Sequence, residues 1–150
     1  MQEWLFRFGY GRPIPLVCPA ASDPGAAPRS FRQAPGQIGS DLVSQYTDIV
    51  SLDQIPPLKP WHRRLFGIGH GNFRVTPLQV ANAFATLARG GRHMMPRLFL
   101  RPAQPPAESV DLQIPLATLA PIYDGTSAVV NEPGGSAYKA FQGSTLYTRG

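Results

Sequence analysis

One stretch, Phe66 to Gly91, constrains the fold of this chain more than any other. It opens with a glycine-spaced loop of Gly67, Gly69 and Gly71. Thr76 suits a helix N-cap because its hydroxyl can accept a backbone N–H of the first turn. Pro77 suits the first helical position, where no N–H is needed, and Gln79 completes a capping box. The pattern predicts a helix over about 77–89 that ends at a glycine.

The side chains of this expected helix fall into two groups. Apolar residues cover most of its surface, namely Leu78, Val80, Ala81, Ala83, Phe84, Ala85, Leu87 and Ala88. Polar residues recur at three- and four-residue spacing in one narrow stripe of Gln79, Asn82, Thr86 and Arg89. This pattern predicts a nearly buried helix, with Phe84 in the core and the polar stripe facing water or a polar cleft. We therefore expect core packing, not direct chemistry, from this helix.

Turn-forming residues dominate much of the remaining sequence. The chain has 150 residues, enough for one modest core, and includes 17 prolines and 15 glycines. This composition predicts a loop-rich chain and excludes a simple helical bundle. Residues 18–40 and 102–109 are expected to be loop or linker segments. Short elements are expected at 8–11 (an FGYG turn), 14–17 (strand), 53–63 (a proline-broken connector), 92–101 (strand), within 112–131 (helix), 136–141 (helical turn) and 144–149 (strand).

Basic residues cluster in the middle of the chain, whose formal net charge is +5. No Asp or Glu occurs between Asp53 and Glu108, and that interval holds Lys59, Arg63, Arg64, Arg74, Arg89, Arg92, Arg97 and Arg101. Such a block can mark a nucleic-acid or anionic-membrane surface. No RNA-recognition signature or helix-turn-helix pattern supports nucleic-acid binding. We favour solvation of these arginines, or their pairing with carboxylates elsewhere in a larger protein.

The sequence gives no indication of a metal or cofactor. A single cysteine, Cys18, excludes an internal disulfide and a cysteine-based zinc cluster. The three histidines lack a ligand spacing such as HExxH, and the glycine loop lacks a Walker lysine and the dinucleotide spacing. There is no signal-peptide pattern, and no segment approaches the roughly 18 apolar residues that cross a bilayer.

Several segments together resemble the transpeptidase domain of penicillin-binding proteins. The sequence FGIGHGNFRVTPLQ resembles the family's IGQG…TPLQ segment, and residues 127–137 resemble its M-x-V-V-x-x-P-G-G-T-A stretch, including Gly134 and Gly135. The FGYG turn and Trp61 match weaker features of the family. His70 replaces the usual Gln of IGQG, and Ser136 replaces the usual Thr. The matches span most of residues 6–150.

The resemblance implies an α+β fold in which helices pack around an antiparallel sheet, with residues 1–150 forming a fragment of a single transpeptidase domain. Such domains cross-link peptidoglycan stem peptides by acyl transfer, and bind β-lactams, through an SxxK serine, an SxN triplet and a KTG strand. Ser136 and Lys139 match SxxK as a pattern, but they lie inside the PGG stretch, which the family places late in the domain. We therefore interpret them as a chance match and expect no catalytic residue in this chain, which alone should be inactive.

The end of the chain, STLYTRG, resembles the strand that leads into the family's KTG. The residues of this expected strand are Thr145, Tyr147, Thr148 and Gly150. The resemblance also implies a parent protein in the cytoplasmic membrane, with this domain on the outer side and other cell-wall synthesis proteins as possible partners. Met1 is then expected to be an internal start. Two alternatives stay open: a non-catalytic interaction module on the same scaffold and, less favoured, an arginine-rich nucleic-acid-binding protein.

Overall fold

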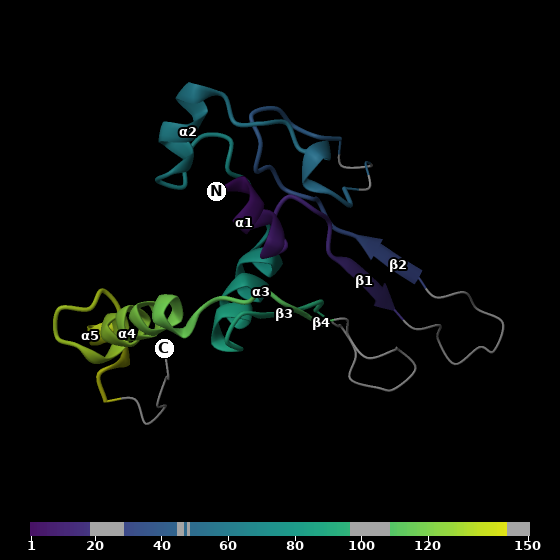
Figure 1. Ribbon diagram of the computed structural model, residues 1–150. Coiled ribbons are helices and arrows are strands. Elements are labelled where there is room, and N and C mark those ends of the chain that lie inside the picture. Colours follow the sequence, from purple (N-terminus) through teal and green to yellow (C-terminus); the bar gives the residue numbers. More distant parts are fainter. Residues whose placement is uncertain (19–28, 45–46, 48, 97–108, 144–150) are drawn as a thin grey trace, which may run out of the picture.

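The computed structural model describes residues 1–18, 29–44, 47, 49–96 and 109–143 (Figure 1). Within these residues the fold mixes helices with small antiparallel sheets, which confirms the α+β prediction. The elements are α1 (Gln2–Arg7), β1 (Pro15–Cys18), β2 (Arg29–Arg32), the short 3-10 helix η1 (Leu52–Gln54), α2 (Pro60–Phe66), α3 (Pro77–Ala88), β3 (Arg92–Met94), β4 (Ser109–Asp111), α4 (Leu116–Asn131) and α5 (Tyr138–Phe141).

The described strands pair two by two. Strand β1 lies antiparallel to β2, with Leu16 opposite Phe31, and β3 lies antiparallel to β4, with His93 opposite Val110. The helix α3 leads directly into β3 through Gly90 and Gly91, whose φ angles are +70° and +91°. These left-handed conformations favour glycine, so the predicted glycine stop is present. The expected continuation of the strand over 97–101 lies outside the described residues.

A small apolar core lies between α1, α2 and the irregular segments that join them. Its buried members are Ile38, Ile49, Ile55, Leu58 and Phe66. Ile38 is only 1% exposed, although it falls within the expected loop over 18–40, and residues 29–32 of that segment form β2. The predicted connector over 53–63 likewise contains the start of α2. Single isoleucines between turn residues have no helix or strand period, so the sequence pattern did not indicate their burial.

The orientation of α3 is the reverse of the prediction. Its polar stripe is buried, with Gln79 1%, Asn82 7% and Thr86 0% exposed, whereas Phe84 is 60% exposed. The expectation of a buried Phe84 and a polar stripe facing water was therefore wrong. Gln79 points inward because neighbouring loops present backbone carbonyls that need hydrogen-bond donors. Thr86 points inward toward the buried His93 side chain.

Replacing Phe84 with Ala is expected to change the free energy of unfolding of this chain by no more than about 0.5 kcal/mol, because the ring is mostly exposed. A buried phenylalanine would cost about 3–5 kcal/mol on the same substitution. Urea unfolding of the two proteins measures the difference. Phe66→Ala, which truncates a core phenylalanine, is the positive control and should lower the free energy of unfolding much more.

The C-terminal part of the described chain is built on α4. This helix covers most of the segment 112–131 in which a helix was expected, and it ends where Pro133, Gly134 and Gly135 were expected to break it. The Tyr123 hydroxyl donates a 2.6 Å hydrogen bond to the carbonyl of Leu87, which joins α4 to the end of α3. The helical turn expected at 136–141 is present as α5. No helix in the described ranges is long and apolar enough to span a membrane.

Candidate functional site

The side-chain amide of Gln79 is the centre of a buried polar cluster beneath α3. Its Oε1 accepts from the Thr76 N–H at 2.9 Å, and its Nε2 donates to the carbonyls of Arg12 at 3.0 Å and Pro35 at 2.9 Å. A longer contact of 3.5 Å reaches the Gly9 carbonyl. The Thr76 hydroxyl accepts from the Gln79 N–H, so the predicted capping box is present. The Gln79 side chain therefore caps the start of α3 and also hydrogen-bonds two separate loops to it.

His93, on β3, continues this cluster. The Thr86 hydroxyl donates to the Asn82 carbonyl at 2.8 Å, so it accepts from His93 Nδ1 at 3.3 Å, and Nδ1 carries the imidazole proton. The other nitrogen, Nε2, is buried and has no partner among the described residues. Burial lowers the pKa of His93, and the nearby charges of Arg12 and Arg89 lower it further. The imidazole is therefore neutral in the folded protein at pH 7.

This depressed pKa makes stability depend on pH. In the unfolded chain this histidine binds a proton below its ordinary pKa of about 6.5. In the folded state His93 binds the proton only at a lower pH, because its pKa is lowered. The folded state therefore loses stability as the pH falls from above about 6.5 through the lower folded pKa. We expect the free energy of unfolding to fall less between pH 7.5 and pH 5 in His93→Gln than in the unmodified chain. His70→Gln, at an exposed histidine, is the control and should keep the full pH dependence. Equal slopes in all three proteins would contradict the assignment.

The glycine loop closes α2. Gly67 ends the helix, and Gly69 and Gly71 have φ angles of +72° and +76°. The backbone N–H groups of Gly67, Gly69 and His70 donate to carbonyls of the last turn of α2. These three donors are already occupied, so they are not available to cradle a phosphate.

A serine and a histidine also lie together beneath α2. Ser40 Oγ is 2.8 Å from His62 Nδ1 and accepts from the Lys59 N–H at 2.6 Å. The side-chain amide nitrogen of Asn72 donates to the Ser40 carbonyl and lies 3.3 Å from His62 Nε2. Because that amide nitrogen can only donate, Nε2 accepts and Nδ1 carries the proton toward Ser40. The histidine therefore cannot take the serine proton, and both side chains are buried, so this pair supports the fold and is not a nucleophile with its base.

Ser136 and Lys139 lie at the surface, where the chain turns from α4 into α5, and both are exposed. No hydrogen bond joins them in the part of the chain that the structure describes. Of the two preceding glycines, Gly134 has open space around it, whereas Gly135 packs against the carbonyls of Ala128 and Val129. Gly135 therefore allows α5 to pack against α4, and Ser136, the next residue, is exposed to solvent.

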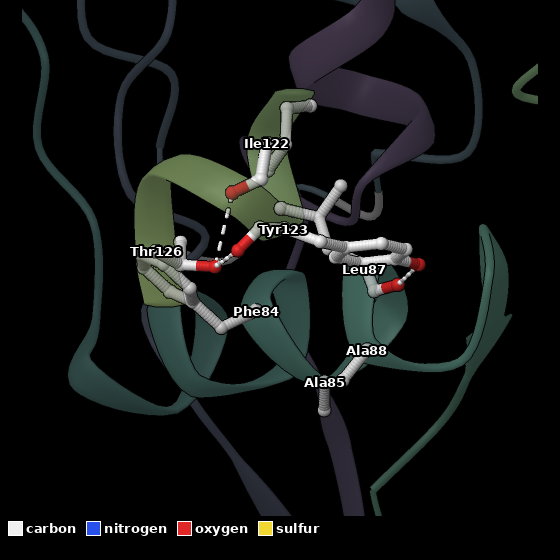
Figure 2. Close-up of a pocket in the computed structure, with 7 residues that line it drawn as sticks. All are labelled: Phe84, Ala85, Leu87, Ala88, Ile122, Tyr123 and Thr126. Carbon is white, nitrogen blue, oxygen red and sulfur yellow. Dashed lines mark hydrogen bonds between the residues drawn. The ribbon is translucent and has the colours of Figure 1, made fainter. Parts of the chain in front are cut away.

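An apolar groove of about 380 Å³ separates α3 from α4 (Figure 2). Its lining consists of Phe84, Ala85, Leu87, Ala88, Ile122, Tyr123 and Thr126. Figure 2 shows the Tyr123 ring crossing toward α3 to reach the Leu87 carbonyl, and the Thr126 hydroxyl turned back onto its own helix. The sequence pattern indicated the apolar residues but not that both helices turn them toward an open groove.

The remaining candidates do not assemble into a site. Among the described residues, no group of three His, Cys, Asp or Glu side chains is placed to hold a metal ion. Thr145, Tyr147, Thr148 and Gly150, expected in the strand that leads to KTG, lie outside the described residues. The chemistry that the described part supports is therefore structural: a polar centre that orders loops and an apolar surface that is not covered.

Comparison with known proteins identifies the family to which this chain belongs. The family model named Transpeptidase, penicillin binding protein transpeptidase domain, matches residues 1–148. No curated protein and no solved structure matches the chain. The matched range includes the glycine loop, the capped helix α3, the PGG turn and α5. The chain therefore belongs to the penicillin-binding protein transpeptidase domain family.

Proposed function

We propose that this chain is a fragment of a penicillin-binding peptidoglycan D,D-transpeptidase that cross-links stem peptides through a serine outside these 150 residues. The observation that carries the proposal is the family match over residues 1–148. The sequence itself contains neither an SxN nor a KTG triplet. Of its SxxK match, Ser136 is exposed on the turn before α5 and Lys139 is exposed on α5. The nucleophile and the residues that activate it are then supplied by other parts of the domain.

In the proposed reaction, the serine oxygen attacks the carbonyl carbon of the penultimate D-Ala of a stem peptide, and the terminal D-Ala leaves as the amine. A second stem peptide's amino group then displaces the serine from the acyl-enzyme, so the peptide bond that was broken is replaced by a cross-link. Backbone N–H groups of the serine and of the KTG strand stabilise the oxyanion. A penicillin reacts by the same attack and leaves the serine acylated.

The described residues support this chemistry indirectly. The Gln79 cluster fixes α3 against two loops, and the groove beside Phe84 and Tyr123 leaves apolar surface uncovered. Exposed apolar surface of this kind is typical of an interface, and we propose that the part of the domain that carries the nucleophile covers it. Residues 144–150 then lead into the KTG strand. The parent protein would be anchored in the cytoplasmic membrane, with this domain on the outer side and other cell-wall synthesis proteins as its partners.

A non-catalytic interaction module on the same scaffold is the second candidate, favoured by the absence of SxN and KTG from the sequence. Labelling with a fluorescent penicillin separates the two. We expect no covalent adduct on this chain alone, either unmodified or as Ser136→Ala. Coexpression with a polypeptide that carries the family's SxxK, SxN and KTG motifs should give a complex that is acylated on the SxxK serine.

The outcomes of this experiment differ clearly. An adduct on the isolated chain that disappears in Ser136→Ala would make Ser136 the nucleophile and overturn the interpretation of a chance match. A stable complex that forms but is never acylated would support the non-catalytic module. Phe84→Glu is a useful further variant, because it places a charge in the groove without touching a buried residue and should weaken the complex.

A further inference from the structure

The exposed side of α2 and the loop that follows it carry a second kind of surface. Helix α2 buries His62 and Phe66, which are four residues apart and share one face. Trp61 and Leu65, also four residues apart, lie on another face and are 61% and 39% exposed, and Ile68 in the following loop is 70% exposed. We name Trp61, Arg64, Leu65 and Ile68 the α2 tip. Figure 1 shows α2 at an end of the molecule well apart from α4 and α5.

The backbone holds the apolar side chains of the α2 tip in place. The N–H groups of Ile68 and His70 both donate to the Leu65 carbonyl, at 3.2 Å and 2.9 Å, so the loop folds back over the end of the helix. Gly71 lies against the Leu65 side chain. Ile68 therefore lies on a hydrogen-bonded turn. Its side chain is not covered by any of the described residues.

The charge of this region is positive. Arg63 and Arg64 are exposed in the last turn of α2, and no ion pair is recorded for either in the described part of the chain. Arg63 donates instead to the Leu58 carbonyl. The nearby carboxylate of Asp41 pairs with Lys59 at 3.3 Å, and the sequence from α2 onward holds no acidic residue until Glu108. The positive charge therefore favours an anionic partner for this surface.

The apolar part of the tip decides which anionic partner fits. Aliphatic side chains such as Ile68 and Leu65 gain free energy in the acyl region of a bilayer, and tryptophan prefers the interface between acyl chains and headgroups. Nucleic-acid surfaces of comparable size use several aromatic side chains to stack on bases, whereas the tip offers only Trp61. Arginine beside these residues can reach phosphate while its stem lies along apolar surface.

We propose that the α2 tip is a peripheral contact site for an anionic lipid membrane, in which Trp61, Leu65 and Ile68 enter the interface and Arg64 binds headgroup phosphate. The inference does not use the transpeptidase proposal, since it depends only on exposure and charge. A short helix with one apolar edge gives weak, reversible binding that depends on anionic lipid.

The test uses the 150-residue chain with Trp4→Phe, which leaves Trp61 as its only tryptophan. Its emission is titrated with vesicles of phosphatidylcholine alone and with vesicles of equal parts phosphatidylcholine and phosphatidylglycerol. We expect a blue shift with the anionic vesicles only, weakened by added salt. Arg64→Glu should reduce binding at least about fivefold, since each basic residue near such a surface is worth about 1 kcal/mol, and the added negative charge repels the lipid further. Ile68→Ser should also weaken binding without changing the net charge.

Two matched controls separate the tip from general electrostatics. Arg92→Glu makes the same change in charge at an exposed residue of β3, and Leu116→Ser removes an exposed aliphatic side chain at the start of α4. Both should bind within about twofold of the parent. Equal loss for Arg64→Glu and Arg92→Glu, or no blue shift at all, would overturn the proposal. Binding to single-stranded DNA in the absence of vesicle binding would instead favour a nucleic-acid surface.

Discussion

Gln79→Leu is expected to destabilise this protein by about 3–5 kcal/mol. Leucine has nearly the same size but removes the amide that donates to the Arg12 and Pro35 carbonyls and accepts from the Thr76 N–H. Gln79 is 1% exposed and its bond to the Pro35 carbonyl is buried, so water cannot replace that bond. Each buried polar group left without a partner costs about 1–3 kcal/mol. The expected range lies in the lower part of the sum for three groups, because the bonds to Thr76 and Arg12 are only partly buried.

Urea unfolding followed by circular dichroism measures this effect. Thr76→Ala removes the hydroxyl of the cap together with the γ-methyl group and should cost about 1 kcal/mol. Gln142→Leu makes the same substitution at an exposed glutamine and should be close to neutral. If Gln79→Leu costs no more than Thr76→Ala, the amide contributes only through the capping box, and the loops over residues 9–12 and 35 are held by other contacts.

The beginning and end of α3 could be predicted from sequence because they depend on neighbouring residues. Thr76, Pro77 and Gln79 lie within one turn, and Gly90 and Gly91 follow the helix directly. The orientation of the helix could not be predicted in this way. A stripe of polar residues is normally placed toward water, but here loop carbonyls that are distant in sequence provide the polar environment.

The same reasoning explains the elements that were missed. The first turn of α2 carries Pro60 at a position that suits a helix start, yet the prolines before it indicated a connector. Strand β2 pairs with β1 across residues that the structure leaves undescribed, and a pairing of this kind has no local signal in its four residues. Ile38 is buried by contacts from α1 and from residues 49–58, so its burial depends on tertiary structure.

The candidate site was predictable only in outline. The motifs around Thr76 and Gly135 indicated the family that the match over residues 1–148 shows. They did not indicate the groove between α3 and α4, because its walls come from two separate helices and the apolar residues of α3 were expected to be buried. Tyr123 was missed as well: its hydrogen bond to the Leu87 carbonyl joins residues 36 positions apart.

The two glycines of the PGG turn are expected to differ sharply in their tolerance of a methyl group. A Cβ added at Gly135 would collide with the carbonyl oxygens of Ala128 and Val129 in the last turns of α4, whereas one added at Gly134 would meet nothing within 4 Å. Because the colliding atoms are backbone, α5 must move away from α4 to accept Gly135→Ala. Overpacking of this kind costs about 1–3 kcal/mol.

Amide hydrogen exchange at Ala137 reports this change directly. Its N–H donates to the Val129 carbonyl at 3.1 Å, the same carbonyl that a Cβ at Gly135 would strike. A loss of about 2 kcal/mol corresponds to an exchange rate roughly thirtyfold faster for Gly135→Ala. Gly134→Ala should exchange like the unmodified chain, since neither residue of the pair has a positive φ angle and only Gly135 lacks room. Equal protection in the two variants would show that α5 does not dock through this turn.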